Sequence, residues 1–400
     1  MDTAVAAPRV TARHWSMLAV ATAAQVSGAC LAHGAAFLIP ALQSQGRSLS
    51  TAGLVASMPL IGTMLALVAW GAAADRYGER LVLISGTVGV ALSSALAVAV
   101  ADHLGALCAA LLLAGAFAAS TNSASGRVVA GWFPAHRRGL AMGIRQMAQP
   151  LGVGLAAATM APLAISQGIA TALWVPAVTA AVAALACALV VADPPRPSRA
   201  DAQAASQLAH PYGNRYLVRI HLASMLLVVP QFTVWTFALV WLVGDLGWSA
   251  GAAGGLVAAT QLLGAVGRIG AGQLSDLVGS RLRPMRWVAI VAAATMVGLA
   301  VTDRLGWDVV AVVLLVVATV VTVADNGLAF TAIAEQAGPF WSGRALGIQN
   351  TGQYLTASTV PPLIGGAVTL LGFPLAFALV ALCPVVAAPL VPVEGEAPLE

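Results

Sequence analysis

Charge is the scarcest property of this sequence. Only 8% of its 400 residues are charged, whereas a soluble domain carries roughly 25%. A chain with so few charges cannot cover its surface in water, so a soluble globular fold is excluded and lipid is the expected solvent. The 60% content of hydrophobic residues agrees with this conclusion.

Lysine is absent, and cysteine is rare. All 19 cationic side chains are Arg, so any salt bridge to a ligand must come from a guanidinium. The net charge of +4 is spread over many segments, which argues against a nucleic-acid partner. The four Cys stand singly in apolar segments and indicate neither a disulfide framework nor a metal site. We expect no cofactor and no metal.

Long apolar segments fill most of the chain. A membrane-spanning helix needs about 20 mostly apolar residues, and twelve segments satisfy this condition. We therefore expect an all-α membrane protein with twelve transmembrane helices. The segments lie near 15–40, 50–74, 81–101, 104–131, 139–165, 168–192, 217–244, 250–275, 286–302, 306–335, 341–370 and 372–393.

A polar connection and two internal repeats divide the chain into halves. The connection, 193–216, is rich in Pro and Arg. It predicts an N-terminal six-helix bundle over 1–192, a cytoplasmic linker, and a C-terminal six-helix bundle over 217–400. GAAADRYGER in the first half recurs as GQLSDLVGSR in the second, and MGIRQMAQPL recurs as LGIQNTGQYL. Such repeats are typical of secondary transporters and predict pseudo-symmetric bundles.

The distribution of Arg predicts the orientation in the membrane. If both termini are cytoplasmic, only Arg47 and Arg304 lie in the connections on the opposite side, and the positive-inside rule is strongly obeyed. We expect a multi-pass protein of the cell membrane (inner or plasma) with both termini cytoplasmic. The Arg on the cytoplasmic side are then Arg9, Arg13, Arg76, Arg80, Arg137, Arg138, Arg196, Arg199, Arg215, Arg219, Arg281, Arg283, Arg286 and Arg344.

The repeated segments resemble the major facilitator superfamily. Its loop motif between helices 2 and 3 is G-x-x-x-D-R-x-G-R-R, in which Glu79 here replaces a usual cation. The segment WFPAHRRGLAMG (132–143) also resembles the loop between helices 4 and 5 of this family. The resemblance implies a transporter that works by alternating access. The matching residues are Gly71, Asp75, Arg76, Gly78 and Arg80 in the first copy, and Gly272, Asp276, Gly279 and Arg281 in the second.

The loop motif is expected to act as a conformational latch. Asp75 can accept hydrogen bonds from a neighbouring helix N-terminus or pair with Arg76 or Arg80. The resemblance implies that this contact holds one conformation and breaks as the halves rock, with Asp276 and Arg281 repeating it. Arg127 is a predicted partner of the Asp75 loop. The alternative is a solvated charged turn.

Two Arg at membrane depth are the predicted solute contacts. Arg145 follows Arg137 by eight residues and Arg268 precedes Asp276 by eight, so each lies about 12 Å from a cytoplasmic edge. In the family that the chain resembles, helices 5 and 8 face each other. The resemblance thus implies that the two guanidiniums converge on an anion, such as a carboxylate. Alternatively, each satisfies backbone carbonyls or an acid near the cytoplasmic mouth.

Five further polar residues complete the predicted site. Gln149 shares the helix face of Arg145 and Gln261 that of Arg268, while Gln349 and Gln353 lie in the eleventh helix. Asp325 is the only acid well inside a helix, which makes it a candidate proton carrier, because a low dielectric disfavours a lone carboxylate. The alternative role for Asp325 is a structural hydrogen bond or salt bridge.

These observations favour a secondary active transporter of a small organic or inorganic anion, with proton symport as the candidate mode of coupling. The Arg268–Asp276 spacing is similar to the nitrate/nitrite, oxalate/formate and monocarboxylate branches of the superfamily. Drug or metabolite efflux stays open as an alternative, and a membrane sensor on a transporter fold is more remote. The sequence contains no paired acids or nucleophile elbow that would indicate an enzyme. The expected partners are the solute and the bilayer, and we expect a monomer.

Overall fold

The computed structural model describes residues 10–196 and 209–396. The middle of the expected linker, 197–208, therefore lies outside the described residues, as do Arg9 and Arg199 of the orientation argument. Every regular element in the described part of the chain is helical, without a strand. This confirms the predicted all-α class.

Eleven helical segments among the described residues are long and apolar enough to cross a membrane. The last of them, Ser342–Gly395, has 54 residues and is far longer than the roughly 20 that a bilayer requires. Its helix α15 (Ser342–Leu390) is interrupted at Gly372, whose φ of 79° and ψ of 170° are not helical. A side chain at this φ would be strained, so glycine suits the turn. Counting α15 as two helices accounts for the twelve that the sequence predicts.

The chain forms two compact units, and each is described separately below. Unit 1 comprises residues 1–134, 147–209 and 337–351, and unit 2 comprises 135–146, 210–336 and 352–400. The division by sequence expected halves at 1–192 and 217–400. The two units differ from it because each also holds a short segment from the other half, 337–351 in unit 1 and 135–146 in unit 2.

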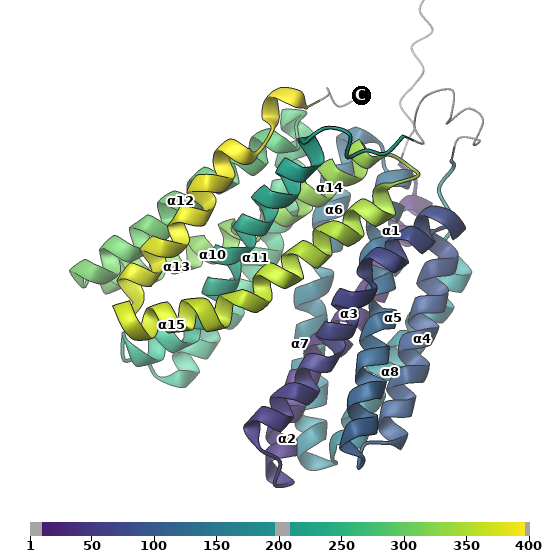
Figure 1. Ribbon diagram of the computed structural model, residues 1–400, viewed down its shortest axis with the longest axis horizontal. Helices are drawn as coiled ribbons and strands as arrows, with labels where there is room; N and C mark the ends of the chain where they lie inside the picture. Colours follow the sequence, from purple (N-terminus) through teal and green to yellow (C-terminus); the bar gives the residue numbers. More distant parts are fainter. Residues whose placement is uncertain (1–9, 197–208, 397–400) are drawn as a thin grey trace, which may run out of the picture. The chain divides into compact units, whose positions relative to one another are not determined.

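In unit 1 (Figure 1), α5 packs against α3 and α4, α4 also packs against α8, and α1 packs against α7. Gly62 and Gly115 allow α3 and α5 to approach closely. A Cβ at Gly62 would lie 2.0 Å from the carbonyl oxygen of Leu112, and one at Gly115 would lie 2.0 Å from that of Pro59. Small residues at such crossings are typical of membrane helices, where dispersion contacts drive association. The helices of unit 1 are α1 (Ala12–Gly34), η1 (Ala35–Leu38), α2 (Ile39–Ser44), α3 (Leu49–Tyr77), α4 (Glu79–Ala99), α5 (Leu104–Trp132), α7 (Ala148–Ser166) and α8 (Ile169–Val190).

In unit 2, α11 packs against α6 and α13, and α12 packs against α13. Trp241 anchors the apolar core of this unit: it is fully buried, stacks edge-on against Phe377 at 5.9 Å, and donates its indole N–H to Asp303 at 3.0 Å. The helices of unit 2 are α6 (Ala135–Gln146), α10 (Tyr216–Gly244), α11 (Ala250–Val278), α12 (Leu282–Leu305), α13 (Asp308–Val321), α14 (Asp325–Ala337), the later part of α15 and η2 (Val393–Gly395).

Besides the first predicted membrane helix, in which η1 separates α1 from α2, two others contain breaks that the hydropathy pattern does not reveal. The fifth is divided into α6, which ends at Gln146, and α7, which begins at Ala148. The tenth is divided into α13 and α14 by the turn 322–324. Both breaks lie beside residues singled out for function, Arg145 in one case and Asp325 in the other.

Candidate functional site

Arg145 is buried near the C-terminal end of α6, with 1% of its surface exposed. Its guanidinium donates to the side-chain oxygen of Gln146 at 2.9 Å and lies 5.6 Å from the centre of the Phe330 ring. A cation over an aromatic face is stabilised by the ring quadrupole. α6 therefore holds this charge away from solvent, beside an amide and an aromatic ring.

Arg268 lies on α11 and is 3% exposed. One of its terminal nitrogens donates to the backbone oxygen of Gln146 at 2.6 Å, and its guanidinium lies 5.9 Å from the Trp235 ring centre. Its Nε is buried without an acceptor among the described residues. Gln146 thus contacts both guanidiniums, one through its side chain and one through its backbone.

The approach of α6 to α11 explains how the two Arg come together. A Cβ at Gly272 would lie 2.2 Å from the carbonyl oxygen of Gly139, and one at Gly143 would lie 2.6 Å from that of Arg268. Only glycine permits backbones to come this close. The crossing places the last turn of α6 directly beside Arg268.

Asp325 is the first residue of α14 and is completely buried. Ser224 on α10 donates to one carboxylate oxygen at 3.2 Å, and the other, Oδ1, has no hydrogen bond to a described residue. The carboxylate and the Arg268 guanidinium attract each other electrostatically. The break before α14 gives Asp325 a helix N-terminus, which favours a negative charge.

An amide network extends from Asp325 towards α15. Gln353 donates to Ser224 at 2.9 Å and to Asn326 at 2.8 Å. Asn326 in turn donates to Gln231 at 3.0 Å. The network joins α10, α14 and α15 next to the buried carboxylate. Ser224, Asn326 and Gln146 were not singled out in the sequence, although the Asp-Asn pair in an apolar segment is a visible signal.

Two of the other predicted glutamines belong to unit 1 and one to α11. Gln149 belongs to unit 1, where its amide contacts the ring of His33 at 3.4 Å. Gln349 also belongs to unit 1 and is 1% exposed. Gln261 lies on α11 and is half-buried. Their contact with a solute stays a prediction, as does that of Arg145, Arg268 and Gln353.

Unit 1 holds the first copy of the loop motif as a buried ion cluster. The Asp75 carboxylate accepts from the backbone N–H groups of Gly343 at 2.8 Å and Arg344 at 3.0 Å, at the start of α15. Arg127 donates to Asp75 and, at 2.6 Å, to Glu79. Asp75 therefore uses a helix N-terminus, one of the two expected partners, and it pairs with Arg127.

Arg76 and Arg80 do not pair with Asp75. Arg76 is exposed and lies over the Tyr77 ring at 5.2 Å, while Arg80 donates to the backbone oxygen of Ala188 at 2.8 Å. Two further cations complete the cluster: Arg196, from the expected linker, donates to Glu79 at 2.9 Å, and the Nε of Arg344 lies 3.8 Å from the Asp75 carboxylate. The spacing of the motif favours its own Arg residues, and the fold replaces them with distant ones.

Unit 2 repeats this arrangement with the second copy of the motif. Asp276 accepts from the N–H groups of Gly139 at 3.0 Å and Leu140 at 2.8 Å, in the first turns of α6. Arg281 bonds both Asp276 and Glu335. Burial disfavours the charged form of Arg281, but Glu335 and Asp276 outweigh burial and raise the pKa of its guanidinium.

The two motif glycines play the same part in each unit. Gly71 faces Gly343 so closely that a Cβ would lie 2.2 Å from the Gly343 carbonyl oxygen, as Gly272 faces Gly139. Gly78 has a positive φ of 98° at the end of α3. In each unit, a glycine contact and an aspartate cap therefore hold the start of a helix from the other half of the sequence.

Comparisons with known proteins agree with this architecture. The model of the Major Facilitator Superfamily matches residues 17–361. A protein described as an uncharacterized MFS-type transporter of Mycobacterium tuberculosis (strain ATCC 25618 / H37Rv) is 47% identical over 392 residues, which cover 96% of this chain and 86% of that protein. A protein of Arabidopsis thaliana named probable anion transporter 4, chloroplastic, is 34% identical over 134 residues, 33% of this chain and 25% of its own.

Solved structures share the fold at low identity. The transporter FucP in its outward conformation has a TM-score of 0.77 at 16% identity and covers 95% of this chain and 99% of its own. The family model spans most of the chain, and the mycobacterial relative aligns over nearly all of it. The chain belongs to the Major Facilitator Superfamily and is a membrane transporter, not an enzyme.

Proposed function

We propose that this transporter carries a small anion, either a carboxylate or an inorganic oxyanion, by alternating access. The observation that carries the proposal is the buried charge in unit 2. Two guanidiniums, Arg145 and Arg268, meet at Gln146, and Asp325 attracts Arg268. Arg268 is 3% exposed and keeps an Nε donor without an acceptor among the described residues, and such a buried cationic donor is stabilised by an anion.

The chemistry of the two Arg favours an oxyanion over a halide. A guanidinium presents planar pairs of N–H groups that match carboxylate and similar oxyanions. The buried Nε of Arg268, which lacks an acceptor among the described residues, is one such donor. The Arabidopsis relative named as a probable anion transporter adds support from part of the chain.

Asp325 supplies the proposed coupling to protons. It is completely buried, has one oxygen without a hydrogen bond to a described residue, and attracts Arg268. Proton binding to Asp325 removes the counter-charge of Arg268 and so strengthens the attraction of Arg268 for the anion. This linkage produces symport, because the proton and the anion then bind best together.

The two aspartate caps are the proposed latches of the transport cycle. Asp75 holds the start of α15 in unit 1, and Asp276 holds the start of α6 in unit 2. Release of either cap frees one helix end that carries part of the proposed site, since α6 bears Arg145 and α15 bears Gln353. We expect the caps to form and break as access alternates.

Uptake into proteoliposomes tests the anion proposal. Labelled monocarboxylates, dicarboxylates, nitrate and phosphate are compared with neutral sugars and cationic dyes. Loss of a charge-assisted hydrogen bond costs about 1.5–3 kcal/mol, so Arg268→Ala should lower uptake efficiency of the anion by roughly 10- to 150-fold. Arg268→Lys should retain part of it because the charge remains.

Exposed Arg283 on α12 provides the matched control, and Arg283→Gln should transport like the wild type. Size-exclusion profiles separate folded variants from aggregated ones. If the folded Arg268→Ala and Arg145→Ala variants both take up the anion as well as the wild type does, the anion site is contradicted. Uptake of cationic dyes alone, indifferent to both variants, identifies an efflux transporter instead.

A further inference from the structure

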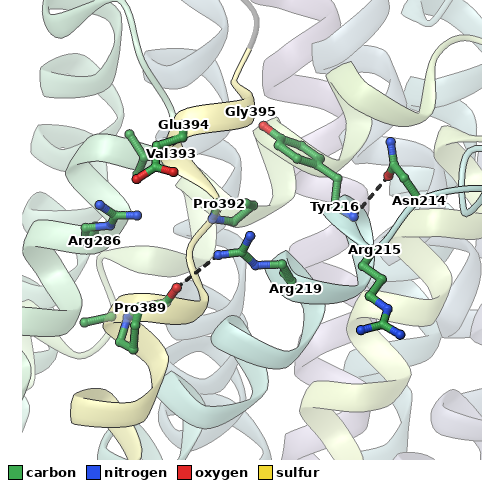
Figure 2. Close-up of a pocket in the computed structure, with 11 residues that line it drawn as sticks. Asn214, Arg215, Tyr216, Arg219, Arg286, Pro389, Pro392, Val393, Glu394 and Gly395 are labelled. Atoms are coloured by element: carbon green, nitrogen blue, oxygen red, sulfur yellow. Dashed lines mark hydrogen bonds between the residues drawn. The ribbon is translucent and has the colours of Figure 1, made fainter.

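A second basic site lies outside the transport cluster, at one end of unit 2. A pocket of about 600 Å³ is formed where α10 begins, α12 begins and α15 ends (Figure 2). This volume falls in the roughly 300–1,000 Å³ range of small-molecule sites. Three of its lining residues are Arg, namely Arg215, Arg219 and Arg286, and one, Glu394, is acidic. The pocket thus carries an excess of two positive charges.

Part of this charge is held in place by the backbone of α15. Arg219 donates to the carbonyl oxygens of Pro389 and Leu390, both at 3.0 Å, and Arg286 donates to that of Val391 at 2.7 Å. Cations at a helix C-terminus are favourable because the carbonyls there lack partners. Figure 2 shows Arg219 and Arg286 reaching the pocket from two different helices.

The guanidiniums of Arg215, Arg219 and Arg286 have N–H groups left for a ligand. A guanidinium has five N–H groups, and Arg219 and Arg286 use only two and one of theirs in the hydrogen bonds above. Within residues 10–196 and 209–396, none of the three Arg forms an ion pair, and neither does Glu394. Arg215 is exposed at the pocket and forms no such pair. These preplaced donors suit a phosphoryl group.

The residues around the pocket favour a lipid over a free ion as its ligand. Within about two turns of the pocket, α10, α12 and α15 each carry an exposed apolar side chain. Leu222 is 45% exposed on α10, Ile290 is 53% exposed on α12, and Val386 is 51% exposed on α15. Exposed apolar side chains on spanning helices are suited to contact with acyl chains. Basic pockets between such helices are suited to lipid headgroups.

We propose that this pocket binds the phosphate headgroup of an anionic phospholipid. The phosphate accepts from Arg219 and Arg286, Arg215 adds long-range attraction, and the acyl chains follow the apolar faces of α10, α12 and α15. The lipid binds unit 2 beside the tail that follows α15. It is independent of the transported solute, so the transport assay and the lipid assay can fail separately.

Lipid binding to the purified full-length protein tests the site. Native mass spectrometry counts bound phosphatidylglycerol, and phosphatidylcholine serves as the neutral lipid. A basic residue near an anionic surface contributes about 1 kcal/mol, which corresponds to a fivefold change in affinity. Arg215→Gln should weaken phosphatidylglycerol binding about fivefold, and Arg215→Gln with Arg286→Gln about 25-fold. Glu394→Gln should strengthen it, because a repelling carboxylate is removed.

Arg283→Gln is the matched control, since Arg283 is exposed on the same end of α12 but does not line the pocket. It should bind the lipid like the wild type. Equal weakening by Arg283→Gln and Arg215→Gln reveals diffuse surface attraction and overturns the site. Inorganic phosphate that displaces the lipid and protects the protein equally well from heat overturns the lipid as the occupant. Weaker phosphatidylglycerol binding by Glu394→Gln also overturns the proposal, because it shows that the carboxylate helps to hold the headgroup instead of repelling its phosphate.

Discussion

The ion cluster around Arg127 predicts a large and specific loss of stability. Asp75 and Glu79 each have side chains at most 2% exposed. Arg127 pairs with both, Arg196 pairs with Glu79, and the partly exposed Arg344 reaches Asp75 at 3.8 Å. Arg127→Met keeps the apolar stem but leaves Asp75 with only this long, partly exposed ion pair. Removing one partner of a buried ion pair costs about 3–5 kcal/mol. We therefore expect Arg127→Met to lower the free energy of unfolding by this amount.

The cost should be recovered by removing the charge left behind. Glu79→Gln added to Arg127→Met leaves Asp75 as the one carboxylate of the cluster, with Arg344 at 3.8 Å as its counter-charge, so the double variant should lose less than about 2 kcal/mol. Thermal unfolding in detergent, followed by Trp fluorescence, measures both. For a domain near 200 residues, each kcal/mol corresponds to about 2–4 °C. Arg127→Met should thus unfold about 6–20 °C below the wild type.

Arg76 in the same loop supplies the control. Arg76 is exposed and contacts only the Tyr77 ring among the described residues. Arg76→Gln should change the stability by less than about 0.5 kcal/mol. If Arg127→Met and Arg76→Gln unfold at the same temperature, or if Glu79→Gln brings no recovery, the reasoning from buried charge is refuted.

Three further predictions concern unit 2. Gly272→Val should disrupt the crossing at Gly139 and abolish transport. Gly270→Val should be tolerated, because a Cβ there meets nothing within 4 Å, and equal uptake by the two variants contradicts the close approach. Asp325→Asn should remove the stimulation of anion uptake by an imposed proton gradient, and retained stimulation assigns coupling elsewhere. Glu396→Ala should cost about 0.5–2 kcal/mol in thermal unfolding, since this residue caps the start of α12, and an unchanged midpoint refutes the cap.

The membrane helices could be predicted from the sequence almost completely. Lipid demands long apolar segments with internally bonded backbones, so their positions are written directly in the hydropathy. The predicted segment 104–131 differs from α5 by one residue at its end, and the reversal near 371 coincides with Gly372. For Asp75 the repeated motif left two partners open, a helix N-terminus or its own Arg residues, and the structure has the helix N-terminus.

The breaks and the long-range polar partners could not be predicted in the same way. Thr322 and the two residues after it are as apolar as residues inside an uninterrupted membrane helix, so the hydropathy profile does not reveal the break before Asp325. Ser224 is one of many hydroxyls that can bond to their own helix. Its contact with Asp325 depends on the packing of α10 and α14, which a single sequence does not encode locally.

The reversal at Gly372 offers no suitable site for inserting a foreign sequence. The helix direction changes within one residue, and the neighbouring Leu370 and Leu371 are 83% and 48% exposed, so no polar connection exists there to carry an epitope, a fluorophore or a glycan acceptor. Foreign sequence is tolerated where exposed backbone connects elements. The exposed turn Gln45–Arg47 in unit 1 is better suited to such an insertion.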